Sequence, residues 1–149
     1  MDKQLTFAQM ERLAELQFGK PPRKHPSHEE HDIQVACVRW FRLSYPHLAK
    51  NLFAIPNGGW RNEAVAAKLK AEGVTAGVFD LELLVARNDC NALFLEAKTK
   101  VGRLSDKQKE WAEVVKNHGY KCVVFRSLDE FIHIIENYLA SNFKEIEFL

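Results

Sequence analysis

The chain lacks the features that mark several specialised classes of protein. It contains only three cysteines, Cys37, Cys90 and Cys122, and no Cys-x-x-Cys spacing, which argues against a disulfide framework and fits a reducing compartment. It contains no apolar run near the roughly 20 residues that cross a membrane. Its first residues, MDKQLTF, lack the apolar core of a signal peptide. We therefore expect a soluble cytoplasmic protein without a membrane partner.

An excess of one charge is also missing. The 149 residues include 21 Lys and Arg against 20 Asp and Glu, a net charge of +1, so no overall positive field predicts nucleic-acid binding. Any contact with DNA or RNA must come from local groups of cations. The chain has two such groups: Lys98, Lys100, Arg103, Lys107 and Lys109, and Arg12, Lys20, Arg23 and Lys24. The simpler interpretation of each group is an ordinary solvated face.

The length suits one domain with one core. Residues 1–26 are predicted to form an amphipathic helix over residues 4–18 and a linker, and residues 27–149 the folded domain. In that domain we expect, in order, a helix at 27–44, a buried strand at 52–55, a helix at 62–72, strands at 78–85 and 92–98, a helix from 105 to 119, a strand at 120–125 and a helix to 140. A hairpin followed by a helical crossover to another strand predicts an α/β fold with a mixed sheet flanked by helices.

Two acidic residues and a lysine lie at the ends of the two hairpin strands. In residues 77–100, GVFDLELLVARNDCNALFLEAKTK, Asp80 precedes one apolar run, and Glu96 and Lys98 end the other. Because side chains alternate along a strand, Glu96 and Lys98 share a face with Phe94. Two carboxylates and an ammonium at one end of a sheet suit metal-assisted phosphodiester hydrolysis. A Glu-x-Lys pair alone is common, and its simpler interpretation is a surface salt bridge.

Three helices have a capping-box spacing at their start. Glu30 lies three residues after Ser27, and Gln108 three residues after Ser105. The third is Ser127 with Glu130. Glu30 also falls on or beside the inward stripe of its helix, which contains Ile33, Cys37, Trp40, Phe41 and Ser44. Whether Glu30 caps its helix or faces a site is therefore open.

The order and spacing of these pieces resemble the VRR-NUC family of the PD-(D/E)xK nuclease superfamily, from about Glu30 to Leu139. The pieces that carry the resemblance are Glu30 with Gln34, residues 55–59 with Arg61, residues 73–80, Glu96-Ala97-Lys98, residues 102–111, and Gly119 with Tyr120. One position departs from the family, which usually has proline before the first acidic residue, whereas this chain has Phe79. The short chain resembles the stand-alone type found in phages and bacteria, so a phage-encoded copy would act in the host cytoplasm.

The resemblance implies a restriction-endonuclease-like αβββαβ core, with the helix at 62–72 inserted after the first strand. It implies a divalent-metal-dependent endonuclease that acts on DNA, in particular on four-way junctions or flaps. The implied ligands of Mg²⁺ or Mn²⁺ are Asp80, Glu96, the backbone carbonyl of Ala97, and Glu30 directly or through water. Lys98 would orient the attacking water or neutralise charge, and Gln108 would lie near the active site, in competition with its capping role. The residues expected to bind substrate are Asn57, Gly58, Gly59, Arg61, Lys100 and Arg103.

Two other functions fit the same residues. One is a nuclease that cuts ordinary duplex, and the other is a catalytically idle DNA-binding module of the same fold. An idle module has no reason to keep two carboxylates close together against their repulsion, which argues against it. Symmetric cleavage of a junction needs two active sites, so we expect a homodimer, with residues 4–18 as one candidate for its interface.

Overall fold

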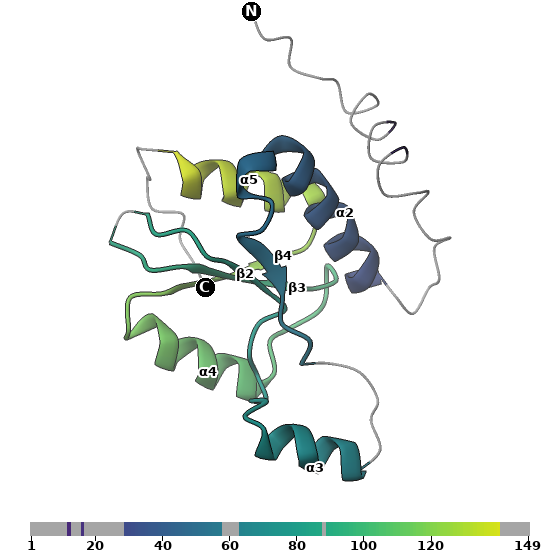
Figure 1. Cartoon of the computed structure of the whole chain (residues 1–149), viewed down its shortest axis with the longest axis vertical. Coiled ribbons are helices and arrows are strands. Elements are labelled where there is room, and N and C mark those ends of the chain that lie inside the picture. The colour runs from purple at the N-terminus through teal and green to yellow at the C-terminus, as the bar shows by residue number, and fades with distance from the viewer. Residues whose placement is uncertain (1–11, 13–15, 17–28, 58–62, 88, 141–149) are drawn as a thin grey trace, which may run out of the picture.

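The computed structural model describes residues 29–57, 63–87 and 89–140, together with Arg12 and Leu16. In these residues a four-stranded mixed sheet carries helices on both faces (Figure 1). Its elements are α2 (Glu29–Ser44), the 3₁₀ helix η1 (Pro46–Leu48), β1 (Leu52–Ala54), α3 (Glu63–Ala71), β2 (Leu81–Leu83), β3 (Leu93–Ala97), α4 (Asp106–Lys116), β4 (Lys121–Phe125) and α5 (Leu128–Leu139). The predicted α/β class and the αβββαβ order, with α3 inserted after β1, are confirmed. The helix and linker predicted at residues 1–26 lie outside the described residues, apart from Arg12 and Leu16.

The strands follow the order β1-β2-β3-β4 across the sheet. β1 is antiparallel to β2 and β2 to β3, whereas β3 and β4 are parallel. The predicted β2–β3 hairpin closes at Arg87 and Cys90, whose backbone groups exchange hydrogen bonds of 2.9 and 2.8 Å. The parallel pair requires the crossover that α4 supplies.

The two faces of the sheet pack against different helices. α2 and α5 lie on one face and α4 on the other (Figure 1). Leu93, Leu95 and Ala97 belong to the core under α2 and α5, whereas Phe94 belongs to a smaller cluster with residues of α4. The alternation predicted for this strand is therefore confirmed, and it places Glu96 on the side of the sheet that we call the α4 face.

Trp111 anchors the cluster on the α4 face. Its ring centroid lies 4.9 Å from that of Phe94 and 5.6 Å from that of Phe79. Phe79, the residue before Asp80, is buried and fills this cluster. The packing fixes α4 against the strand that carries Glu96.

Several local expectations were wrong. β1 is an edge strand, so only Leu52 is buried, and Phe53 is 38% exposed. β2 has three residues, Leu81–Leu83, rather than the eight expected over 78–85, and it pairs with three residues of β1 and with three of β3. Ser44 is exposed at the end of α2, where the helix leaves the core.

The capping box expected at the start of α5 forms only in part. Ser127 Oγ accepts a hydrogen bond from the Glu130 amide at 3.1 Å. The Glu130 carboxylate, however, accepts from the Arg126 amide at 2.7 Å, one residue before the position that a reciprocal box requires.

Cys37, Cys90 and Cys122 are buried and carry free thiols. Of the helices in the described part of the chain, none has the length and apolar character needed to cross a membrane.

Candidate active site

Asp80 and Glu96 lie side by side at one end of the hairpin, next to the paired residues Leu81 and Leu95. The Asp80 amide donates a hydrogen bond of 3.1 Å to Glu96 Oε2. The Ala97 amide donates one of 3.2 Å to Asp80 Oδ2. Each carboxylate is thus held by a backbone amide of the opposite strand, and the predicted pair is brought together.

Glu96 is the one buried charged side chain among the described residues, at 1% exposure. Besides the Asp80 amide, its Oε1 accepts hydrogen bonds from Lys98 Nζ at 2.7 Å and from Gln108 Nε2. The Lys98 side chain is itself only 13% exposed. These donors offset part of the cost of burying a carboxylate.

The protonation of the site follows from burial and from the close charges. Burial raises the pKa of Asp80, although the Ala97 amide and the Lys98 charge oppose the shift. Burial also raises the pKa of Glu96, and the charge of Asp80 adds to this, against the opposing hydrogen bond from Lys98. Both carboxyl groups therefore hold their protons at higher pH than usual.

The charges around Lys98 outweigh the effect of burial on its pKa. Its burial would lower the pKa of the ammonium, but the hydrogen bond to Glu96 and the charges of Glu96, Glu30 and Asp80 outweigh burial and raise it. At neutral pH Lys98 is therefore a cation. This favours charge neutralisation over the role of general base, which would need a lowered pKa.

Gln108 contacts both its helix cap and the carboxylate of Glu96, the two places that the sequence set in competition. Its Oε1 accepts from the Ser105 amide at 2.9 Å, and its own amide donates to Ser105 Oγ at 3.3 Å, so the capping box is complete. Its Nε2 donates to Glu96. The two contacts are compatible because a carboxamide has an acceptor at one end and a donor at the other, and a role of Gln108 in the reaction stays a prediction.

Gly77 brings the segment before Asp80 into direct backbone contact with α4. Its φ is +93°, and a Cβ there would lie 2.3 Å from the carbonyl oxygen of Lys107. A residue with a side chain would therefore need both an unfavourable backbone conformation and a displaced helix. The close approach sets the first turn of α4, with Gln108, beside the carboxylates.

Glu30 approaches the site from the first turn of α2. Its Oε1 accepts a hydrogen bond of 3.2 Å from the Thr99 amide, and its charge is among those that raise the pKa of Asp80 and Lys98. Ser27, its expected capping partner, lies outside the described residues. In the described part of the chain no three His, Cys, Asp or Glu side chains are grouped so that they could hold a metal ion, so Glu30 as a ligand stays a prediction.

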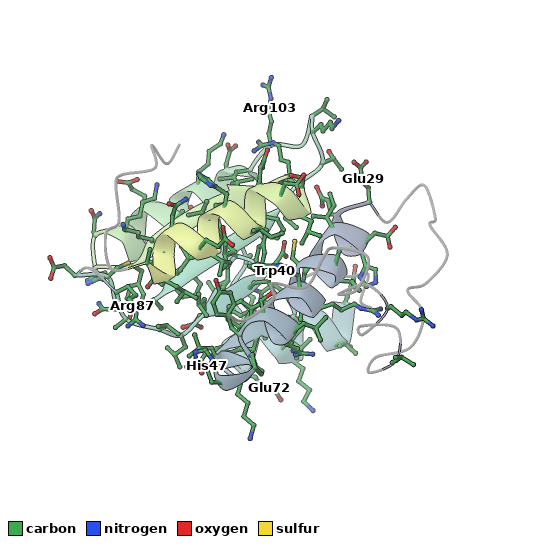
Figure 2. The ribbon with its side chains drawn as sticks, turned by 90° about the horizontal axis from the view of Figure 1, so that it is seen from above. Glu29, Trp40, His47, Glu72, Arg87 and Arg103 are labelled. Atoms are coloured by element: carbon green, nitrogen blue, oxygen red, sulfur yellow. The ribbon has the colours of Figure 1, made fainter. Side chains whose placement is uncertain are left out.

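The residues expected to bind substrate fall into three groups. Asn57 donates from Nδ2 to the carbonyl oxygen of Val78 at 3.3 Å, so it ties its loop to the segment before Asp80. Gly58, Gly59 and Arg61 lie outside the described residues. Lys100 and Arg103 are exposed, and Figure 2 shows the Arg103 side chain pointing outward at the edge of the molecule.

Two contributors near the site were not expected. Thr99 holds Glu30 through its backbone amide, a role that any residue type except proline can fill and that leaves no signal in a sequence. Arg126 donates from Nη2 to the carbonyl oxygen of Gly102 at 3.3 Å. It follows β4 in the chain, and no local pattern relates it to a loop 24 residues earlier.

Comparison with known proteins places the chain in a family. The family model of the VRR-NUC domain matches residues 28–129. A solved structure described as a VRR_NUC domain protein is similar to the chain, with a TM-score of 0.65 and 28% sequence identity over 74% of this chain and 88% of that chain. No curated protein gives a significant match. The chain therefore belongs to the VRR-NUC domain family, which is of nuclease type.

Proposed function

We propose that the protein is a divalent-metal-dependent endonuclease that hydrolyses phosphodiester bonds in structured DNA, such as four-way junctions or flaps. The observation that carries the proposal is the pairing of Asp80 and Glu96 in a half-buried cluster with Lys98 and Gln108. Burying these polar and charged groups together lowers the stability of the fold. A role in metal-assisted hydrolysis would explain why they lie together.

The donor set fits Mg²⁺ or Mn²⁺. Carboxylate and carbonyl oxygens are the ligands these hard cations prefer. The pKa values of Asp80 and Glu96 are raised by burial, and the Asp80 charge raises that of Glu96 further, so a divalent cation would relieve an existing excess of negative charge. Asp80, Glu96, the carbonyl of Ala97 and, directly or through water, Glu30 would hold it. A bound cation of this kind lowers the pKa of a water ligand and offsets charge on the phosphate.

Lys98 and Gln108 would prepare the site for reaction. An ammonium has three donors, so Lys98 can keep its hydrogen bond to Glu96 and still contact the attacking water or a phosphate oxygen. The carboxylates around Lys98 raise its pKa, so its proposed role is to orient the attacking water or to neutralise charge as an ammonium. Gln108 holds Glu96 in one orientation through Nε2, which reduces the reorganisation that ligand binding requires.

The contacts to DNA would come from local cations. Lys100 and Arg103 are exposed close to Lys98 along the chain, where they can bind phosphates on either side of the scissile bond. Asn57, which donates to the carbonyl of Val78 just before Asp80, would contribute together with Gly58, Gly59 and Arg61, as the resemblance to the family implies. For cleavage of a four-way junction the protein would act as a homodimer, which light scattering of the purified protein would test.

The direct test is cleavage of end-labelled four-way junction, flap, linear duplex and matching RNA substrates with Mg²⁺, Mn²⁺ or EDTA. The proposal expects metal-dependent cutting, strongest on the branched DNA, and loss of cutting in Asp80→Asn. Preference for linear duplex would indicate a nuclease of ordinary DNA. Binding without cleavage in every metal would indicate the idle module, and cleavage unchanged in Asp80→Asn would reject the site.

A further inference from the structure

We infer that the turn from Thr99 to Gly102 is a wedge that places Val101 against exposed bases at a branch or nick in DNA. The inference rests on the proposed function and names the feature of the substrate that the same site would recognise. The turn directly follows Lys98, and the Gly102 amide closes it with a hydrogen bond of 3.1 Å to the Thr99 carbonyl. Lys100 and Val101 therefore form its tip.

The turn is fixed to the body of the protein from several elements. Glu30 of α2 accepts from the Thr99 amide at 3.2 Å, and Arg126 donates to the Gly102 carbonyl at 3.3 Å. The Lys98 amide donates to Phe125 of β4 at 3.0 Å. A Cβ at Gly102 would lie 3.0 Å from Thr99 Oγ1 and 3.3 Å from Glu30 Oε1. The tip therefore sits on a supported base, unlike an ordinary mobile loop.

The side chain at this tip is apolar and almost fully in solvent. Val101 is 88% exposed, more than any other large hydrophobic residue among those described. Single exposed hydrophobic residues are common and need no explanation alone. This one projects from a supported turn three residues after Lys98, with the exposed cations Lys100 and Arg103 around it. The turn begins one residue after Lys98 and is bonded to Glu30, so it lies next to the residues proposed to hold the metal.

An apolar side chain between cations matches DNA whose bases are accessible. Lys100 and Arg103 can contact neighbouring phosphates, and an apolar side chain between them can press against a base face where stacking is interrupted. In intact duplex that insertion requires unstacking a step, whereas at a branch or nick the bases are already partly free. The turn would thus favour branched or nicked DNA over continuous duplex without reading its sequence.

The test uses flap DNA with 2-aminopurine at the branch point, whose fluorescence rises when the base loses its stacking. Asp80→Asn protein serves as the non-cleaving parent, and Val101→Ala and Val101→Lys are made in that background. Val114→Ala is the matched control, because Val114 is also an exposed valine, 54% exposed, but lies on α4. Thermal melting of each variant checks that folding is unaffected.

We expect the parent and the Val114→Ala control to raise the fluorescence equally. Val101→Ala should reduce the rise and weaken flap binding by about fivefold, with little change for continuous duplex. Val101→Lys should keep duplex binding, because it adds a phosphate contact, but still lose the fluorescence rise. Equal fluorescence and equal flap preference in the parent and both Val101 variants would overturn the wedge while leaving the nuclease intact. Absence of DNA binding by the parent, together with absence of cleavage by wild type, would reject the proposed function as well.

Discussion

Glu96 accepts hydrogen bonds from the Asp80 amide, Lys98 Nζ and Gln108 Nε2 in a position that is 1% exposed. Asp80 beside it has the Ala97 amide as donor. Burial outweighs these compensations, since it raises the pKa of both carboxyl groups. At the scale of residues, the site therefore holds negative charge that the folded protein would be more stable without, which is typical of functional sites.

Replacing Asp80 by Asn should stabilise the metal-free protein by about 1 kcal/mol at pH 8. A carboxyl group whose pKa is raised on folding contributes stability below its unfolded pKa, and this contribution is lost as pH rises through the folded pKa. The gain from Asp80→Asn should therefore be larger at pH 8 than at pH 4. Urea unfolding in EDTA at both pH values measures it, and a gain that does not grow with pH would contradict the assignment.

At the scale of elements, the first turn of α4 links folding to the site. Gln108 belongs to a complete capping box with Ser105 and also donates to Glu96. Ser127 makes the same kind of cap at the start of α5, but Glu130 in the matching position contacts the Arg126 amide instead of a site residue. Replacing either serine by alanine therefore removes the same kind of helix cap. Only at Ser105 does the capped turn also carry a residue that contacts Glu96.

Ser105→Ala and Ser127→Ala should each cost about 1 kcal/mol of stability, because each removes an N-cap hydrogen bond. Only Ser105→Ala should also reduce the cleavage rate, by about tenfold, since a frayed first turn no longer holds Gln108 against Glu96. Unfolding curves and single-turnover cleavage are measured for both variants. Equal rates in the two variants would show that the cap of α4 does not support the site.

The contact between Gly77 and α4 gives a second test at this scale. Gly73 and Gly77 have similar positive φ values, +99° and +93°, but a Cβ at Gly73 meets nothing within 4 Å, whereas one at Gly77 meets the Lys107 carbonyl. Gly73→Ala should lower the free energy of unfolding by about 1 kcal/mol, because only the backbone conformation becomes less favourable. Gly77→Ala should cost about 2 kcal/mol more and reduce cleavage, because α4 must shift.

Thermal unfolding and cleavage of the two glycine variants separate these effects. Equal losses of stability in Gly73→Ala and Gly77→Ala would mean that α4 moves aside without cost. A Gly77→Ala protein with wild-type cleavage would mean that the position of Gln108 does not matter.

At the scale of the whole molecule, patterns among neighbouring residues predicted the element order and the pairing of Asp80 with Glu96. The period-2 alternation around Glu96, the serine caps and the helix-ending glycines gave the element order, and the hairpin brought Asp80 to Glu96. Contacts between distant segments were not predictable, among them Gly77 with Lys107 and Arg126 with Gly102. The exposure of Phe53 was missed because a strand's place at the edge of a sheet depends on all the other strands.

The net charge of +1 makes DNA binding depend on a few local cations. Replacing Lys100 and Arg103 together by Ala should weaken binding and reduce the slope of log K against log salt by about 2, one for each phosphate contact. Lys50→Ala is the control, because Lys50 is exposed and precedes the end of β1 that pairs with Leu83, away from Asp80. A salt titration of fluorescence anisotropy measures the slopes, and an unchanged slope in the double variant would exclude these two cations from the interface.

Mn²⁺ binding, followed by the loss of the free-ion signal in electron paramagnetic resonance, shows directly whether Asp80 and Glu96 form a metal site. It needs neither a substrate nor turnover. We expect saturable binding by wild type and by Glu113→Gln, a change at an exposed carboxylate of α4. Mn²⁺ affinity should be at least about tenfold weaker in Asp80→Asn and in Glu96→Gln. Equal Mn²⁺ affinity in all four proteins would show that Asp80 and Glu96 do not form the metal site.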